Sequence, residues 1–223
     1  LASMGQKLVS DNNDILVGIT TPATLSLSNA TKDKPIIMAG ITYPVEAGLI
    51  KSEDKPGNNI TGVSDRTPIK QQLEIMKKVL PKMKKVGILY TASEDNSVKQ
   101  AQEAEKLAKE LGLEVKVSSI ANTNDIQQVT ESLASETDAI FVPIDNTIAS
   151  AMSTVVKVTD AKKIPVFPSA DTMVADGGVL GIGVDQYKIG VETAKVVAKV
   201  LKGEDTKNMP IVLANEGVIY FCL

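Results

Sequence analysis

The sequence predicts an α/β protein in which helices cover buried parallel sheets. Short apolar runs rich in β-forming residues alternate with longer segments whose apolar residues recur at helical spacing. Ala, Val, Ile and Leu are plentiful, whereas aromatic residues make up only 3% of the 223 residues, as expected where helices pack on buried sheets. Such alternation is typical of βα units joined into parallel sheets with helices on both faces.

The apolar runs and their boundary residues give each element in order. Strands are predicted at residues 15–19, 35–39, 60–63, 86–90, 114–118, 138–142, 164–167, 179–184, 211–214 and 217–221. Helices are predicted at 1–10, 22–31, 43–50, 68–80, 95–111, 124–134, 147–162 and 187–202. Pro22 suits a first helical position, Pro81 ends the helix of 68–80, and Gly203 follows the last helix.

Composition excludes several classes of function. The net charge is −3, Arg66 is the only arginine and no basic block stands out, so we expect no nucleic-acid partner. The chain has no histidine and one cysteine, Cys222. That removes histidine-based acid–base catalysis, Cys–His nucleophiles and almost every zinc site. We therefore expect no metal and no cofactor.

Polar loops follow most of the predicted strands, at residues 20–24, 41–43, 63–65, 91–97, 144–147, 168–171 and 184–187. In a parallel sheet these loops emerge at one edge, where α/β proteins bind small ligands. Helix capping alone explains their Ser, Thr and Asp residues. It does not explain why four of the seven aromatic residues lie in or beside these loops: Tyr43, Tyr90, Phe167 and Tyr187. Apolar rings beside convergent polar groups favour a small-molecule pocket.

The residue types in these loops suggest an amino acid as the ligand. Thr20, Thr21 and Thr24 surround a predicted helix N-terminus, whose free amides favour a carboxylate. Acidic loop residues offer partners for an ammonium group, and aromatic rings can hold an apolar side chain. For any single acid the alternative is a solvated helix cap. Asp145 is the best exception, because it closely follows the apolar run 139–143.

Five groups of motifs occur along nearly the whole chain: Asn59-Ile60-Thr61-Gly62-Val63-Ser64-Asp65; Val86-Gly87-Ile88-Leu89-Tyr90 with Ser93-Glu94-Asp95-Asn96-Ser97; Pro143-Ile144-Asp145-Asn146 with Ala149-Ser150-Ala151; Pro165-Val166-Phe167; and Gly183-Val184-Asp185-Gln186-Tyr187 with Ile189-Gly190. In this order they resemble the ABC-transporter substrate-binding protein family that includes the TrpX-type tryptophan-binding lipoproteins. Each motif alone is weak, but the ordered set is specific.

The resemblance implies a type I periplasmic-binding-protein fold with two Rossmann-like lobes that close on ligand in the cleft between them. Crossovers near Lys84, Asp185 and Ala214 would give a first lobe of 1–84 and 186–213 and a second of 85–185 and 214–223. Family members begin with a further strand and loop, so we expect an N-terminally truncated piece of a longer protein. The expected ligand-binding residues are Thr21, Thr24, Tyr43, Asp65, Ser93, Glu94, Asn96, Ser97, Asp145, Asn146, Ser169 and Asp185.

The resemblance also implies the extracellular, lipid-anchored receptor of an ABC importer, which hands its ligand to a membrane permease. We expect a monomer that binds an aromatic amino acid, tryptophan or phenylalanine. An enzyme is not expected, because no nucleophile–base constellation or glycine-rich phosphate loop is present. The alternative from another class is the effector-binding domain of a LacI-like transcription regulator, which shares this fold.

Overall fold

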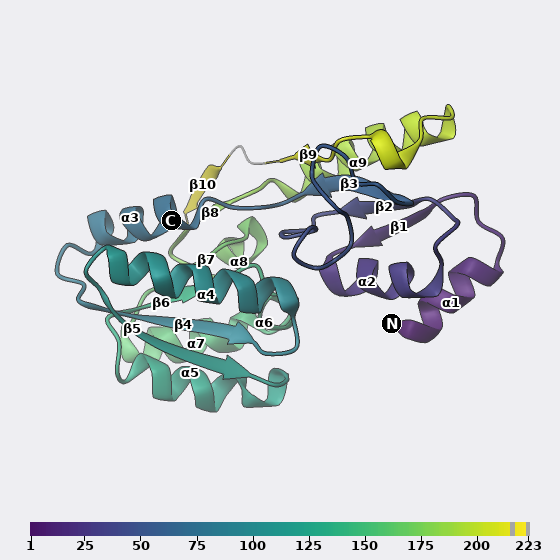
Figure 1. Ribbon diagram of the computed structural model, residues 1–223. Coiled ribbons are helices and arrows are strands. Elements are labelled where there is room, and N and C mark those ends of the chain that lie inside the picture. Colours follow the sequence, from purple (N-terminus) through teal and green to yellow (C-terminus); the bar gives the residue numbers. More distant parts are fainter. Residues whose placement is uncertain (215–216, 222–223) are drawn as a thin grey trace. The chain divides into compact units, whose positions relative to one another are not determined.

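The computed structural model describes residues 1–214 and 217–221 (Figure 1). The chain divides into two compact units. Unit 1 comprises the described residues of Leu1–Arg66 and Val184–Glu216, and unit 2 those of Thr67–Gly183 and Gly217–Leu223. Each unit has its own sheet, as expected of an α/β protein with two lobes. Cys222 lies outside the described residues.

Unit 1 is built on a four-stranded parallel sheet in the order β1-β2-β3-β9. Its strands are β1 (Leu16–Ile19), β2 (Ile36–Ala39), β3 (Ile60–Ser64) and β9 (Val212–Leu213), and its helices are α1 (Ala2–Ser10), α2 (Thr21–Ala30), α9 (Gln186–Leu201) and the 3-10 turn η2 (Thr206–Asn208). Ile36 and Met38 pack with Leu27 of α2, whereas Ile37 packs with Ile189 of α9. Because neighbouring strand residues point to opposite faces, helices cover both faces of this sheet.

Unit 2 is built on a parallel sheet in the order β5-β4-β6-β7 and an antiparallel pair, β8 with β10. The strands are β4 (Lys85–Thr91), β5 (Glu114–Ile120), β6 (Ala139–Val142), β7 (Val166–Pro168), β8 (Leu180–Gly183) and β10 (Val218–Phe221). The helices are α3 (Ile69–Val79), α4 (Asp95–Glu110), α5 (Ile126–Ala134), α6 (Asn146–Ala149), α7 (Met152–Lys162), α8 (Asp171–Ala175) and the turn η1 (Thr123–Asp125).

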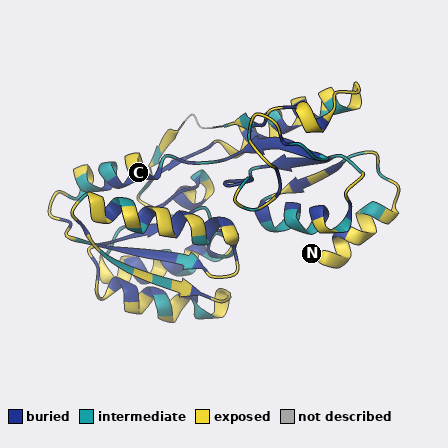
Figure 2. Ribbon diagram, viewed as in Figure 1, coloured by how far each residue is buried: buried dark blue, intermediate teal, exposed yellow. Residues whose placement is uncertain are grey.

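Two apolar clusters line the two faces of the unit 2 sheet. Phe141 packs with residues of α3 and α4, whereas its neighbour Ile140 packs with residues of α5 and α7. Strands β4, β6 and β7 are buried between the helices, whereas β5 and β10 are partly exposed (Figure 2). This arrangement confirms the predicted α/β class with parallel sheets.

Four details differ from the sequence-based prediction. Residues 43–50 form hydrogen-bonded turns and no helix, with the carbonyl of Pro44 accepting from the amides of both Leu49 and Ile50. The helix expected at 147–162 is divided into α6 and α7, because Ala151 leaves the helical region at φ −131°. Helix α8 and the antiparallel pairing of β10 are not apparent from the sequence pattern.

The division into units also differs from the predicted lobe boundary near Lys84. Helix α3 belongs to unit 2, so the first boundary falls between Arg66 and Thr67. The reason is packing: Leu73 and Met76 of α3 are fully buried in the same cluster as Phe141. The second boundary, before Val184, lies close to the predicted crossover at Asp185.

Candidate functional site

In unit 1, the carboxyl ends of three neighbouring strands bring the predicted loops to one edge of the sheet. Thr20 follows β1, Thr42 follows β2 by a short turn, and Asp65 follows β3 directly. The strands are parallel and in register, so these ends lie side by side. The first turn of α9, which begins after Asp185, lies beside this edge, because Ile189 approaches Gly40 at the end of β2.

Thr20 has a backbone conformation that L residues rarely adopt. Its φ of 73° and ψ of 159° lie in a region that is essentially reserved for glycine, at a cost of about 1–3 kcal/mol. The turn is held by two partners of Thr20: its amide donates to the carbonyl of Ala39 at 3.0 Å, and its carbonyl accepts from the amide of Thr24 at 3.1 Å. Strain of this kind clusters at binding sites, and here it sets the direction in which α2 begins.

Thr24 clamps the start of α2 onto β1. Its hydroxyl lies 3.0 Å from the carbonyl oxygens of both Gly18 and Thr20, and the side chain is fully buried. A Cβ at Gly18 would come within 2.4 Å of that hydroxyl, so only glycine allows this close approach. Thr24 is therefore engaged with the backbone, and the free amides of the first turn of α2 remain the anion-binding feature of this edge.

Asp65 is a buried carboxylate at the end of β3. It is 4% exposed and accepts a 2.8 Å hydrogen bond from the hydroxyl of Thr42. Burial raises the pKa of Asp65 from 3.8 to about 6, and the hydrogen bond from Thr42 only partly opposes this rise. None of the ion pairs recorded for the described residues includes Asp65. A buried acid in this state suits an incoming ammonium group.

The neighbouring Arg66 does not neutralise Asp65, because its guanidinium is directed elsewhere. It donates to a carboxylate oxygen of Glu53 at 2.7 Å and to the carbonyl of Thr42 at 3.3 Å. It also lies 5.2 Å from the ring centroid of Tyr43, within the range of a cation–π contact. The buried Tyr43 is thus held in the loop after β2 by a residue at the unit boundary.

In unit 2, Asp145 joins three elements at the carboxyl edge of the sheet. One carboxylate oxygen accepts from the amide of Thr91 at 2.7 Å and from the hydroxyl of Ser97 at 2.5 Å. The other accepts from the hydroxyl of Thr91 at 2.8 Å and the amide of Ile148 at 2.9 Å. Burial raises the pKa of Asp145 and the nearby Glu94 adds to the rise, while these hydrogen bonds oppose it. Asp145 therefore caps α6 and ties it to β4 and α4.

Glu94 is engaged in the same way from the opposite loop. One oxygen accepts from the amide and the side chain of Asn146, at 3.0 and 2.7 Å. The other accepts from the amide and hydroxyl of Thr147, at 2.8 and 2.6 Å. Four donors match the accepting capacity of one carboxylate, so Glu94 and Asp145 lock the 91–97 and 143–147 loops together. Asp65, with one side-chain donor, has more accepting capacity left for a ligand than Glu94 or Asp145.

The remaining predicted residues of this edge are three in the loops after β4 and β6 and one, Ser169, that lies deeper. The side-chain NH2 of Asn96 donates to the carbonyl of Ile144 at 2.8 Å, which leaves its buried oxygen without a hydrogen-bond partner. Ser93 and Asn146, in the same two loops, are exposed. Ser169 lies deeper, fully buried, and its hydroxyl is 3.3 Å from the side-chain oxygen of Gln72.

Two fully buried glutamines support these loops, although neither is among the predicted site residues. Gln100 accepts from the amide of Ile144 at 2.7 Å and donates to the hydroxyl of Thr67 at 3.2 Å. Gln72 donates to the carbonyl of Pro168 at 2.8 Å. Both lie on the apolar face of a predicted helix. A glutamine at a position where the helical pattern calls for an apolar residue is the sequence signal that could have identified them.

Within residues 1–214 and 217–221, no group of His, Cys, Asp and Glu side chains could hold a metal ion. The same residues contain no helix that is long and apolar enough to span a membrane. The unit 1 edge offers a helix N-terminus and the buried acid Asp65, and the unit 2 edge offers the buried amide oxygen of Asn96, which has no hydrogen-bond partner. Groups of these kinds can bind a polar small molecule.

Comparison with known proteins identifies the family. The chain is 39% identical over 217 residues to a tyrosine-binding protein of Clostridioides difficile. The matched region covers 97% of this chain and 63% of that protein. It is 44% identical, with a TM-score of 0.96, to the ABC domain of Streptococcus pneumonia solved in complex with L-Trp, over 99% of this chain and 75% of that one.

The ligand-free, open structure of a Clostridium difficile substrate-binding protein with adhesive properties is 34% identical, with a TM-score of 0.72, over 99% of this chain and 75% of that one. A LacI family regulator of Bifidobacterium animalis is 14% identical over the whole chain and 80% of its own, with a TM-score of 0.63, and so shares the fold alone. The model of the family described as ABC transporter substrate binding protein matches residues 1–220, so the chain belongs to that family.

Proposed function

We propose that the protein is the solute-binding component of an ABC importer and that its ligand is an aromatic amino acid. The observation that carries the proposal is the pair of relatives at 39% and 44% identity, one called tyrosine-binding and one solved with L-Trp, each matched over nearly the whole of this chain. Since the chain spans 63% of the tyrosine-binding protein's length, activity and substrate are properties to be tested on the complete protein.

The chemistry of unit 1 supports an amino acid as the ligand. The amides at the start of α2 favour a carboxylate, and Asp65 offers a buried negative charge to an ammonium group. Burial of the ligand's ammonium beside Asp65 would lower the pKa of this carboxyl and release a proton near pH 6. Binding should therefore be proton-linked at mildly acidic pH.

The edge of unit 2, taken by itself, has groups that can contact a polar ligand. The buried oxygen of Asn96 lacks a donor, and Ser93 and Asn146 of the same two loops are exposed. Glu94 and Asp145 contribute by holding the two loops in place. We assign these two acids a positioning role and assign direct contact to Asn96 and Ser93.

The cellular setting is part of the same proposal. We propose that the protein works outside the cytoplasmic membrane as a monomeric, lipid-anchored receptor and delivers its ligand to a membrane permease, with no nucleic-acid partner. Family membership supports the importer role, and the predicted resemblance to tryptophan-binding lipoproteins supports the anchor. The reading as a regulator is supported only by distant structures such as one at 14% identity.

Isothermal titration calorimetry of the complete protein tests the proposal with matched ligands. L-tryptophan, L-tyrosine and L-phenylalanine should bind, whereas tryptamine, which lacks the carboxylate, and indole-3-propionate, which lacks the ammonium group, should bind far more weakly. Asp65→Asn should weaken tryptophan by about 10- to 100-fold, the effect of losing one charge-assisted hydrogen bond, and should spare indole-3-propionate. No heat with any amino acid would overturn the proposal.

A further inference from the structure

A strongly basic turn joins α3 to β4. Residues 77–85 read Lys77-Lys78-Val79-Leu80-Pro81-Lys82-Met83-Lys84-Lys85, with five lysines and no acid in nine positions. The chain as a whole has a net charge of −3. The expectation from composition that no basic block stands out is therefore wrong for residues 77–85. Lys78, Lys82 and Lys84 are exposed, and Lys77 and Lys85 are partly buried.

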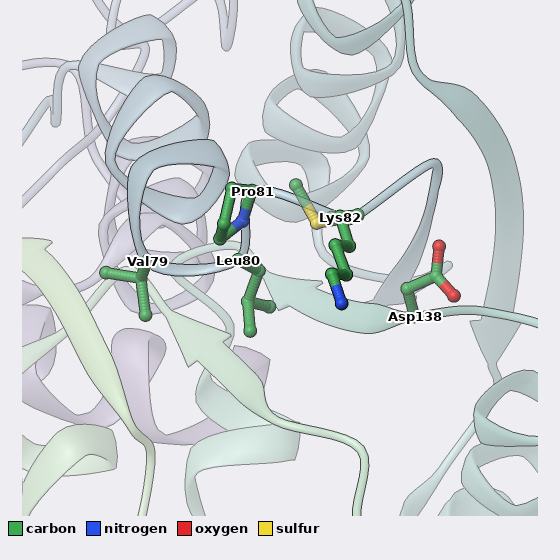
Figure 3. A pocket seen from close by; sticks show the side chains of 6 residues that line it. Val79, Leu80, Pro81, Lys82 and Asp138 are labelled. Carbon is green, nitrogen blue, oxygen red and sulfur yellow. The ribbon is translucent and has the colours of Figure 1, made fainter.

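The same turn exposes apolar side chains beside the lysines. Val79 is 47% exposed, and it lines a hollow of about 300 Å³ together with Leu80, Pro81, Lys82, Met83 and Asp138. Figure 3 shows the side chains of Leu80 and Lys82 pointing to the same side of the turn. Apolar and cationic groups therefore share one surface, which we call the basic turn surface (residues 77–85).

This surface lies at the edge of the unit 2 sheet opposite the candidate binding residues. The turn directly precedes β4, and Asp138 directly precedes β6. The two strands are parallel, so their starts share one edge and the loops at 91–97 and 143–147 share the other. A partner on the basic turn surface would leave the candidate site of this unit free.

Acids lie at the same edge of the unit, since Glu114 is the cross-strand partner of Lys85 and the Lys85 charge helps to lower the pKa of Glu136. Asp138 accepts from the backbone amides of Lys84 and Lys85 at 2.8 and 2.9 Å, and these bonds hold its pKa below the usual value. Glu136 pairs with Lys116, and Lys77 donates to the carbonyl of Leu111. No ion pair recorded for the described residues uses Lys78, Lys82 or Lys84.

We propose that the basic turn surface docks the protein on anionic phospholipid headgroups. Exposed lysines attract the phosphates of an acidic bilayer surface. The exposed side chains of Val79 and Pro81 can enter the boundary between headgroups and acyl chains. A polyanion such as nucleic acid offers no apolar layer for them to enter. The turn also lacks the arginines and aromatic rings that nucleic-acid binding favours. Docking in this way holds the protein beside the membrane through a surface that takes no part in ligand binding.

Vesicle flotation of the complete protein without its lipid group tests this docking. Vesicles of phosphatidylcholine with one third phosphatidylglycerol should bind the protein, vesicles of phosphatidylcholine alone should not, and high salt should abolish binding. The triple variant Lys78→Glu, Lys82→Glu, Lys84→Glu should reduce binding to the anionic vesicles at least tenfold. Val79→Ser should reduce it severalfold.

The charge-matched control is Lys195→Glu, Lys199→Glu, Lys202→Glu on the exposed side of α9, which should bind vesicles nearly as the wild type does. If both triple variants lost vesicle binding equally, net charge alone would explain the binding, and the proposal would be overturned. Equal binding to both vesicle types, or displacement by a short DNA duplex as effective as excess anionic vesicles, would overturn it too. Amino-acid binding measured in parallel should be unchanged in every variant, so failure of docking is distinguishable from failure of the proposed function.

Discussion

The hydroxyl of Thr42 donates a 2.8 Å hydrogen bond to Asp65, and this neutral group is the carboxylate's only recorded side-chain partner among the described residues. The pKa of Asp65 is raised to about 6, so the folded state binds this proton more tightly than the unfolded state does. The free energy of unfolding should therefore fall as pH rises from about 4 to above 6, by up to about 3 kcal/mol from this group.

Asp65→Asn should remove this dependence. The variant should be more stable than the wild type at pH 7.5, and the gain should shrink as pH falls through 6 and vanish near pH 4. Urea unfolding at several pH values measures the difference, with Asp54→Asn at an exposed site of the same unit as the control for lost charge. A gain that stays constant with pH would show that Asp65 is not the titrating group.

Asp145→Asn should destabilise the protein by about 3 kcal/mol, because an amide NH2 would face the donors of Thr91 and Ser97 in place of a carboxylate oxygen. Thermal unfolding measures the loss. The matched control is Asp185→Asn, which keeps a good capping side chain at the exposed start of α9 and should cost about 0.5 kcal/mol or less. Equal effects of the two substitutions would remove the special role given to Asp145.

Thr20→Gly should stabilise the protein by about 1 kcal/mol. Relief of about 1–3 kcal/mol of backbone strain exceeds the entropy cost of about 0.5–1 kcal/mol that a glycine brings. Chemical denaturation measures the change in the free energy of unfolding. The control is Thr172→Gly in helix α8, where glycine relieves no strain and should only destabilise the protein. A destabilised Thr20→Gly variant would mean that the side chain contributes more than the strained backbone costs.

Gln100→Leu should cost about 2 kcal/mol, because the part-buried amide of Ile144 loses its acceptor and Thr67 loses a donor. Gln102→Leu, on the exposed side of the same helix, should change stability by no more than about 0.5 kcal/mol. Urea denaturation separates the two. If they behave alike, Gln100 is not the support of the 143–147 loop.

Local sequence patterns predict much of the fold. Strand β4 and helix α4 are apparent because an apolar run is followed by capping residues and a helical period within one short stretch. The division of residues 147–162 into two helices and the antiparallel pairing of β10 depend on contacts between distant segments, which local periodicity does not contain. For the same reason the sequence alone assigns α3 to the first lobe, whereas its packing against Phe141 places it in unit 2.

The sequence predicts where the candidate site residues lie, because the loops that carry them follow the predicted strands. The edges gather Thr21, Thr24, Tyr43 and Asp65 in unit 1, and the 93–97 and 145–146 residues in unit 2. Residue type does not reveal that Glu94 and Asp145 are saturated by internal donors while Asp65 is not, because that depends on which side chains the fold brings together. The contact roles of all these residues stay predictions.

The most direct test of the central claim is thermal melting of the complete protein with each of the twenty amino acids in turn. A ligand at about a hundred times its dissociation constant adds about 2.7 kcal/mol to the free energy of unfolding, which raises the melting temperature by several degrees. We expect this rise with tryptophan, tyrosine or phenylalanine and none with aliphatic or charged amino acids. A flat response to all twenty, or a rise confined to non-aromatic amino acids, would contradict the account.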